Sequence, residues 1–220
     1  MGRPKIPRKS TSIDMTAMCD VAFLLLSFFI LTTKFKPAEA IAVTTPSSVA
    51  SKIAPDKDVV LVTIDPTGKI FLSMGDDKSD VSKKEALADL IMQTKQISFD
   101  KNKFAKAHFW GCSFGQLPSF LNIPEENRKG NLLSGIPTDT TKGTNEVYEW
   151  LKLVTQVYSG QKMNLLLKGD NDAKYPAFKC VIDAFKKNDL MKFQMVTNPE
   201  SIPVGSELWK SNMKGLKRDE

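Results

Sequence analysis

The 220-residue chain has little of the material that catalytic and metal sites usually need. It contains one histidine and three cysteines, which stand far apart. Its glycines form no phosphate-binding loop, and no nucleophile is arranged with a base in a known pattern. We therefore expect neither an enzyme nor a bound cofactor or metal. His108 is interpreted as a surface or locally hydrogen-bonded side chain.

Dense charge of one sign is also missing. The net charge of +6 is spread along the chain, and no basic stripe with interleaved aromatic residues suggests a nucleic-acid partner. With 41% hydrophobic residues, the composition suits one globular domain with additional segments. The one long apolar run covers residues 15–33, and a single charge interrupts it at Asp20.

This apolar run predicts a transmembrane helix over residues 14–34. Nineteen residues in helical form span about 28 Å, close to the thickness of about 30 Å of a hydrocarbon core. Two other interpretations stay open. Residues 38–40, Ala-Glu-Ala, resemble a signal-peptidase site, and a soluble core helix could have similar composition. Lys34, Lys36 and the acid inside the run favour a membrane anchor.

Charge predicts the orientation of this anchor. Basic residues without acids precede the helix, so the positive-inside rule places residues 1–13 in the cytoplasm as a short tail. In a bacterium the chain would be a single-pass inner-membrane protein with a periplasmic C-terminal part. Because the periplasm is oxidising, Cys112 and Cys180 could form a disulfide, although the sequence leaves their pairing open. The basic residues of the tail are Arg3, Lys5, Arg8 and Lys9.

Asp20 requires a functional explanation. A carboxylate inside an apolar span costs about 2.5–3.5 kcal/mol on insertion scales. Helical spacing places Thr16 and Ser27 on the same face, which makes a narrow polar stripe. Desolvation favours the neutral form of a carboxylate, so a proton can bind and leave. We predict that Asp20 carries protons; capping at the interface and static pairing with a basic partner are the alternatives.

The remainder predicts a small α+β domain of β-β-α-β-α-β type with an insertion. Prolines among small residues indicate a flexible linker over residues 35–57. The domain covers 58–198, with an ordered insertion at about 97–144, and a polar tail covers 199–220. A capping-box pattern at residues 82–85 predicts the start of the first helix. Further predicted elements are strands at 59–64, 69–73, 163–169 and 192–197 and helices at 145–158 and 175–187.

The segment from Ile13 to Phe29, IDMTAMCDVAFLLLSFF, resembles the signature of the ExbD/TolR family of bacterial biopolymer transport proteins. Asp20 falls on the proton-carrying aspartate of that family. Ala17 stands where the family usually has proline, which leaves the helix start less defined. Within residues 145–197, the stretch from Leu165 to Thr197 also resembles the family's last strand–helix–strand, while the insertion has no family counterpart that we recognise.

The resemblance implies a subunit of a proton-driven motor. Such a protein dimerises, its helices pass through a ring of ExbB-like multi-span subunits, and its periplasmic domains act on a TonB-like protein that opens outer-membrane transporters. A TolR-like envelope or motility motor is an alternative within the family. A tethered periplasmic binding module without a proton role is an alternative of another class.

Overall fold

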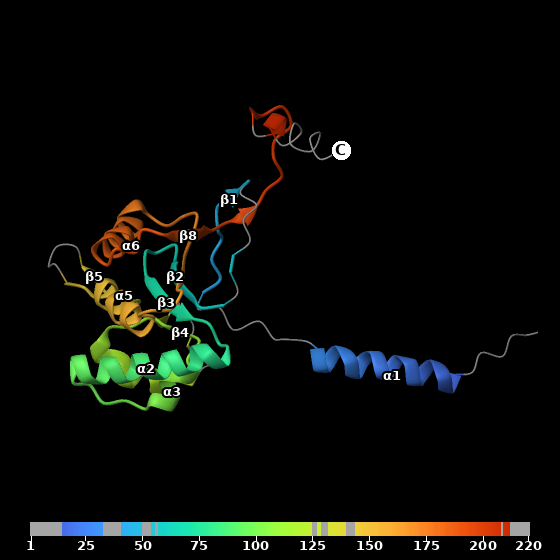
Figure 1. Cartoon of the computed structure of the whole chain (residues 1–220), viewed down its shortest axis with the longest axis horizontal. Coiled ribbons are helices and arrows are strands. Elements are labelled where there is room, and N and C mark those ends of the chain that lie inside the picture. Colours follow the sequence, from blue (N-terminus) through green and yellow to red (C-terminus); the bar gives the residue numbers. More distant parts are fainter. Residues whose placement is uncertain are drawn as a thin grey trace, which may run out of the picture. The chain divides into compact units, whose positions relative to one another are not determined.

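The computed structural model describes residues 15–32, 41–49, 54–55, 57–124, 127–128, 132–139, 144–207 and 209–211. The predicted cytoplasmic tail lies outside these ranges, as do parts of the predicted linker and C-terminal tail. The chain divides into two units, residues 1–37 and 38–220. The first contains helix α1 (Met15–Thr32), and the second contains an α+β domain (Figure 1).

A five-stranded mixed sheet forms the centre of the domain, with strand order β4-β3-β2-β7-β8. Strands β2, β3 and β4 are antiparallel neighbours, whereas β7 runs parallel to both β2 and β8. The strands are β2 (Val59–Ile64), β3 (Ile70–Met74), β4 (Phe109–Trp110), β7 (Asn164–Gly169) and β8 (Phe193–Val196).

The predicted strand–turn–strand is confirmed as the β2–β3 hairpin. Gly68 adopts a φ of +86°, a backbone conformation that side chains rarely allow. The Asp65 carboxylate accepts hydrogen bonds from the Thr67 hydroxyl and, at 2.7 Å, from the Lys69 amide. A turn residue with a short acidic side chain therefore fixes the hairpin register.

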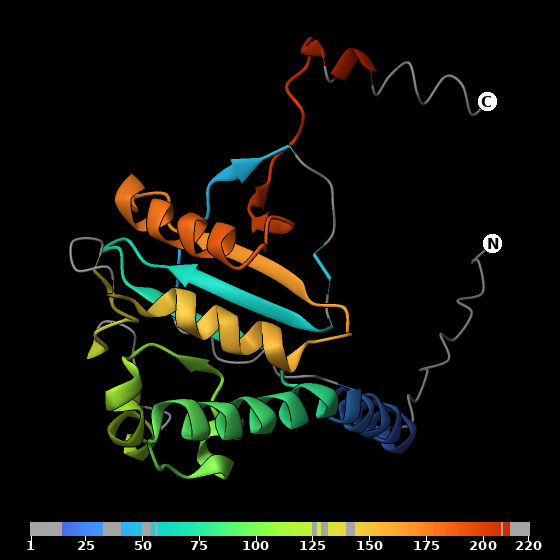
Figure 2. The ribbon, with the colours of Figure 1, turned by 60° about the vertical axis from the view of Figure 1, so that its left-hand side comes forward.

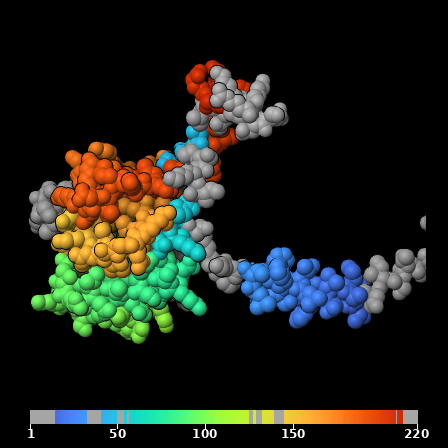
Figure 3. All heavy atoms as spheres, in the orientation of Figure 1, coloured from blue at the N-terminus to red at the C-terminus, as the bar shows by residue number. Residues whose placement is uncertain are grey.

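Three helices lie side by side on one face of the sheet: α2 (Lys78–Lys95), α5 (Glu146–Val157) and α6 (Tyr175–Lys187) (Figure 2). Their outer surfaces are visible together in Figure 3, in green, gold and orange. The predicted helices 145–158 and 175–187 are confirmed within a residue. The domain is α+β with a mixed sheet, as predicted, but its element order is longer than β-β-α-β-α-β, because α5 and the elements of residues 97–144 lie between α2 and β7.

The predicted start of the first domain helix is wrong. Helix α2 begins at Lys78 after the extended residue Asp77, so Ser82 lies inside the helix and does not cap it. The Asp77 carbonyl accepts the amide of Asp80 at 2.9 Å, and an acid in the first turn suits the positive end of the helix dipole. The Ser82–Glu85 pattern is one turn too late.

The predicted insertion forms part of the hydrophobic core. It contains α3 (Lys101–Lys106), β4, a 3₁₀ turn (Phe114–Gln116), α4 (Leu117–Asn122), β5 (Thr138–Asp139) and β6 (Thr144–Asn145). Trp150 of α5 stacks on Phe114 at 4.7 Å between ring centroids and on Trp110 at 5.9 Å. Phe104 stacks on Trp110 at 4.6 Å. Three insertion aromatics thus pack with one helix outside it.

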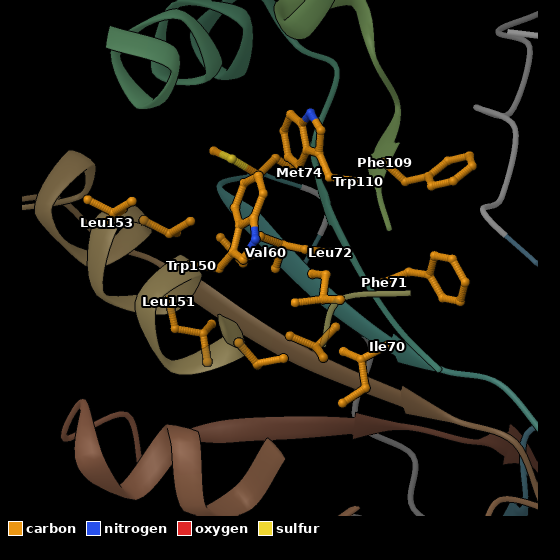
Figure 4. Close-up of a cluster of buried hydrophobic side chains, with 14 of the residues drawn as sticks. Val60, Ile70, Phe71, Leu72, Met74, Phe109, Trp110, Trp150, Leu151 and Leu153 are labelled. Atoms are coloured by element: carbon orange, nitrogen blue, oxygen red, sulfur yellow. The ribbon is translucent and has the colours of Figure 1, made fainter. Parts of the chain in front are cut away.

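Side chains alternate along β3 and β4, so both strands place apolar residues on both faces of the sheet. Leu72 pairs with Trp110, and both side chains point to the side of Trp150, whereas Phe71 and Phe109 point the opposite way (Figure 4). All five are buried. The edge strand β4 therefore contributes to the hydrophobic core on both faces of the sheet, which explains why it is apolar at both positions.

Part of the predicted flexible linker is bound to the domain. Strand β1 (Ser47–Ser48) pairs in parallel with β9 (Asn198–Pro199). The Thr44 amide donates to the Asp170 carboxylate at 2.8 Å, and Thr45 is buried. Residues 44–48 of the predicted linker therefore have hydrogen-bond partners in the second unit, while the flexibility of the linker stays a prediction.

Candidate functional site: helix α1 and Asp20

Helix α1 is apolar around most of its surface, apart from a narrow stripe that contains Asp20. No residue of α1 is buried, and large side chains such as Phe23 (66% exposed) and Leu31 (84% exposed) project outward. A helix that is apolar around most of its surface needs a nonpolar environment, either a protein core or a membrane. Its 18 residues are long and apolar enough to cross a membrane. Together with its place outside the domain, this fits a single-pass membrane protein.

The polar stripe predicted on α1 follows from its observed helical form. Asp20 is the one charged residue between Met15 and Thr32, and its side chain is exposed. Thr16 lies one turn before it and Ser27 two turns after it, so the three share a face. The Ser27 hydroxyl donates to the Leu24 carbonyl at 2.9 Å. Its oxygen keeps the capacity to accept a hydrogen bond along the stripe.

The chemistry available to this stripe is narrow. One carboxylate with two hydroxyl groups can bind and release a proton or accept hydrogen bonds, but it offers too few oxygen ligands for a metal ion. Within the described ranges of the chain, no group of three or more His, Cys, Asp or Glu side chains could hold a metal. A partner protein must therefore supply the remaining walls of any ion path.

The single histidine belongs to a charge cluster in the domain. His108 Nδ1 lies 3.0 Å from one oxygen of Asp76, and the other oxygen accepts from Lys84 Nζ at 2.6 Å. Lys84 is fully buried and also donates to the Ala107 carbonyl at 3.2 Å. Asp76 therefore balances a buried cation, and His108 is locally bonded, as its interpretation from the sequence required.

The disulfide considered for Cys112 and Cys180 is absent, because both are free thiols. Each is buried separately: Cys112 follows β4 and lies near Glu146, whereas Cys180 belongs to α6. Burial raises the pKa of the Cys112 thiol to about 12 and also raises the pKa of Cys180. Both groups are thus protonated at neutral pH and poorly reactive.

Sequence reasoning missed the buried charges of the domain. Lys84, Asp80 and Asp170 are each at most 5% exposed. Asp170 directly follows a predicted strand, which was a usable signal, because polar residues at strand ends often bond to neighbouring backbone. Lys84 and Asp80 lie within a helix whose start had been placed too late, so their face could not be assigned.

Comparison with known proteins identifies the N-terminal part. Residues 7–109 match the family model described as "Biopolymer transport protein ExbD/TolR". This span takes in α1 with Asp20, the β2–β3 hairpin, α2, α3 and the first residue of β4. The resemblance of residues 145–197 lies outside it. No curated protein and no solved structure matches the chain. Residues 7–109 are thus similar to the ExbD/TolR family of biopolymer transport proteins.

Proposed function

We propose that the chain is an ExbD-like subunit of a proton-driven motor in the bacterial inner membrane, with Asp20 as its proton carrier. The observation that carries this proposal is the position of one carboxylate on an otherwise apolar helix that the family match includes. A helix that served only as an anchor would gain nothing from a charge that is costly to insert.

The proposed work cycle follows from the size of the membrane field. A proton that crosses the full field releases about 2.3 kcal/mol for each 100 mV. Asp20 alternates between ionised and neutral forms as α1 meets two aqueous half-paths, and the change of charge alters which surroundings the helix prefers. The helix then turns or shifts, and residues beyond it transmit the movement to the periplasmic domain.

The partners in this proposal are chosen by what α1 lacks. One helix with one acid cannot enclose a proton path, so an ExbB-like ring of multi-span subunits surrounds the helices of a homodimer. A TonB-like protein receives the work in the periplasm and opens outer-membrane transporters. A TolR-like role in the envelope or in motility uses the same helix with a different receiver.

The decisive experiment replaces Asp20 in cells that depend on the energised output. Asp20→Asn removes the titratable group and keeps the size of the side chain, so we expect membrane insertion and folding to persist while the output is lost. Cys19→Ser, at the adjacent position, is the matched control and should retain the output. Output retained by Asp20→Asn would contradict the proton role.

Purification in mild detergent separates the motor from a tethered binding module. The motor requires a multi-span protein that stays bound around α1, and mass spectrometry would identify it. If the chain purifies alone from membranes in which it is functional, the tethered module becomes the better account. The identity of the bound soluble receiver distinguishes a TonB-like from a Tol-like system.

A further inference from the structure

A buried carboxylate lies at the corner of the domain where the chain begins β2. Asp80 is in the first turn of α2, and its side chain is 1% exposed. Its Oδ1 atom finds no hydrogen-bond partner in the described part of the chain. Its Oδ2 atom lies against Gly75, where a Cβ atom would approach to 2.1 Å. Holding an ionised carboxylate in such a place is costly.

Charged and titratable groups face Asp80 from three elements. Lys83 lies one turn further along α2, and Asp77 precedes that helix. Asp58, just before β2, forms an ion pair with Lys83. Tyr158, at the end of α5, has a buried hydroxyl without a partner in the described ranges, and the Lys83 ammonium lies 4.5 Å from its ring centroid. The Lys83 ammonium thus lies among several acidic groups.

The same cluster fixes the backbone at this corner. The Asn164 amide donates to the Asp58 carbonyl at 2.8 Å, and the Asn164 side chain donates to the Lys57 carbonyl at 2.7 Å. Asn164 is the first residue of β7. The Lys83–Asp58 ion pair and the two Asn164 hydrogen bonds therefore hold residues 57–58 against the sheet.

We propose that Asp80 is the proton-binding group of a clamp that acid strengthens. When Asp80 is neutral, Lys83 pairs with Asp58 alone, and residues 57–58 stay firmly hydrogen-bonded to Asn164. When Asp80 is ionised, Lys83 is divided between two carboxylates, and a poorly solvated charge destabilises the corner. The proposal concerns the folded domain, and it does not depend on the motor function of α1.

The direction of the proton linkage follows from the surroundings. Burial raises the pKa of Asp80 most strongly; Lys83 opposes this effect, and the charges of Asp58 and Asp77 add to it. The folded state therefore binds this proton more tightly than the unfolded state. Stability from this group is gained as the pH falls through the folded pKa and is lost as the pH rises through it.

The test is hydrogen exchange at the Asn164 amide in the full chain in detergent, corrected for the intrinsic rate at each pH. We expect wild-type protection to rise as the pH is lowered from 8 to 4, by up to about tenfold for each unit by which the pKa is raised. Asp80→Asn should remove this pH dependence. Asp172→Asn, an exposed acid at the other end of β7, should leave it intact.

Protection that is flat in the wild type, or that still depends on pH in Asp80→Asn, would overturn the proposal. Lys83→Gln provides a second test, because it keeps Asp80 in place if Asp80→Asn fails to fold. Loss of the ammonium removes the Lys83–Asp58 ion pair and an attraction for ionised Asp80, so the protection of Asn164 should fall and its remaining midpoint should move to higher pH. An unchanged midpoint in Lys83→Gln would also overturn the proposal.

Discussion

Helix α1 and the α+β domain treat apolar and charged groups in opposite ways. In α1, Phe23 and Leu31 are exposed along with every other large apolar side chain. In the domain, Trp110 and Trp150 are fully buried, and they stack on each other. The domain buries its own apolar side chains, whereas those of α1 need a nonpolar environment that the helix itself does not supply.

The two regions also differ in how they hold charge. The domain surrounds buried Lys84 with the carboxylate of Asp76 and the carbonyl of Ala107, so its charge has partners within the chain. The polar neighbours of Asp20 on its face of α1 are Thr16 and Ser27, which carry hydroxyl groups. The fold can hold a buried charge that has partners within the chain, whereas we propose that Asp20 finds its partners in another subunit.

The variant with the largest expected effect tests whether α1 and the domain use their charged groups for different purposes. Asp20→Asn should abolish the energised output while the thermal unfolding of the domain stays unchanged, because α1 contributes no buried residue to the domain core. Circular dichroism melting of the purified chain, with Cys19→Ser beside it, provides the measurement. A lower melting temperature in Asp20→Asn would show that the two regions are energetically coupled.

The next largest effect is expected from a variant that lowers the stability of the domain and leaves α1 unchanged. Trp150→Ala removes a fully buried ring that stacks on Phe114 and Trp110, so the domain should lose about 3–5 kcal/mol of unfolding free energy. Denaturant titration of the full chain would measure it. Trp209→Ala, in the C-terminal segment outside the core, should cost far less. Equal costs for the two variants would contradict the role assigned to the aromatic stack.

A smaller effect concerns the segment between the two regions. Asp170→Ala removes the carboxylate that accepts the Thr44 amide, a charge-assisted hydrogen bond worth about 1.5–3 kcal/mol. Residues 44–48 should then exchange their amide hydrogens faster, whereas Asp172→Ala should leave this exchange unchanged. If residues 44–48 stay protected in Asp170→Ala, the pairing of β1 with β9 suffices to hold the segment.

The smallest effect sharpens the account of the β2–β3 hairpin. Gly68→Ala places a side chain at a φ of +86°, which should cost about 1 kcal/mol or somewhat more. The added Cβ would meet the Ala177 side chain at 3.4 Å, an ordinary contact, so strain in the backbone is the cause. Gly160→Ala, at a similar φ of +78° with open space around it, is the matched comparison. It should show a similar loss in the same denaturant titration.

Local patterns predicted much of the domain. Alternation and helical periodicity gave the hairpin, α5, β7, α6 and β8, because each of these elements is encoded within a short window. The start of α2 was misplaced, since a capping-box pattern inside the helix competed with Asp77. Short elements of the insertion were missed because its aromatic residues, such as Phe104 and Phe114, have no common period.

Nonlocal pairing explains what else could not be predicted. Strands β1 and β9 have two residues each, and they lie about 150 residues apart in the sequence. Neither segment has a pattern of its own, so only the folded domain reveals that part of the linker is bound. Asp20 was evident from the sequence, because one charge in an apolar run is a local signal; the proposed partners of Asp20 would lie in other chains.

Infrared difference spectroscopy tests the central claim about Asp20 most directly. Membranes that contain the assembled complex would be compared across pH, with Asp20→Asn as the reference. The account predicts a carbonyl band of a protonated carboxyl group that grows as the pH falls, that exchanges with deuterium from the solvent, and that is missing in Asp20→Asn. Absence of such a band in the wild type at every pH, with Asp20 ionised throughout, would contradict the account.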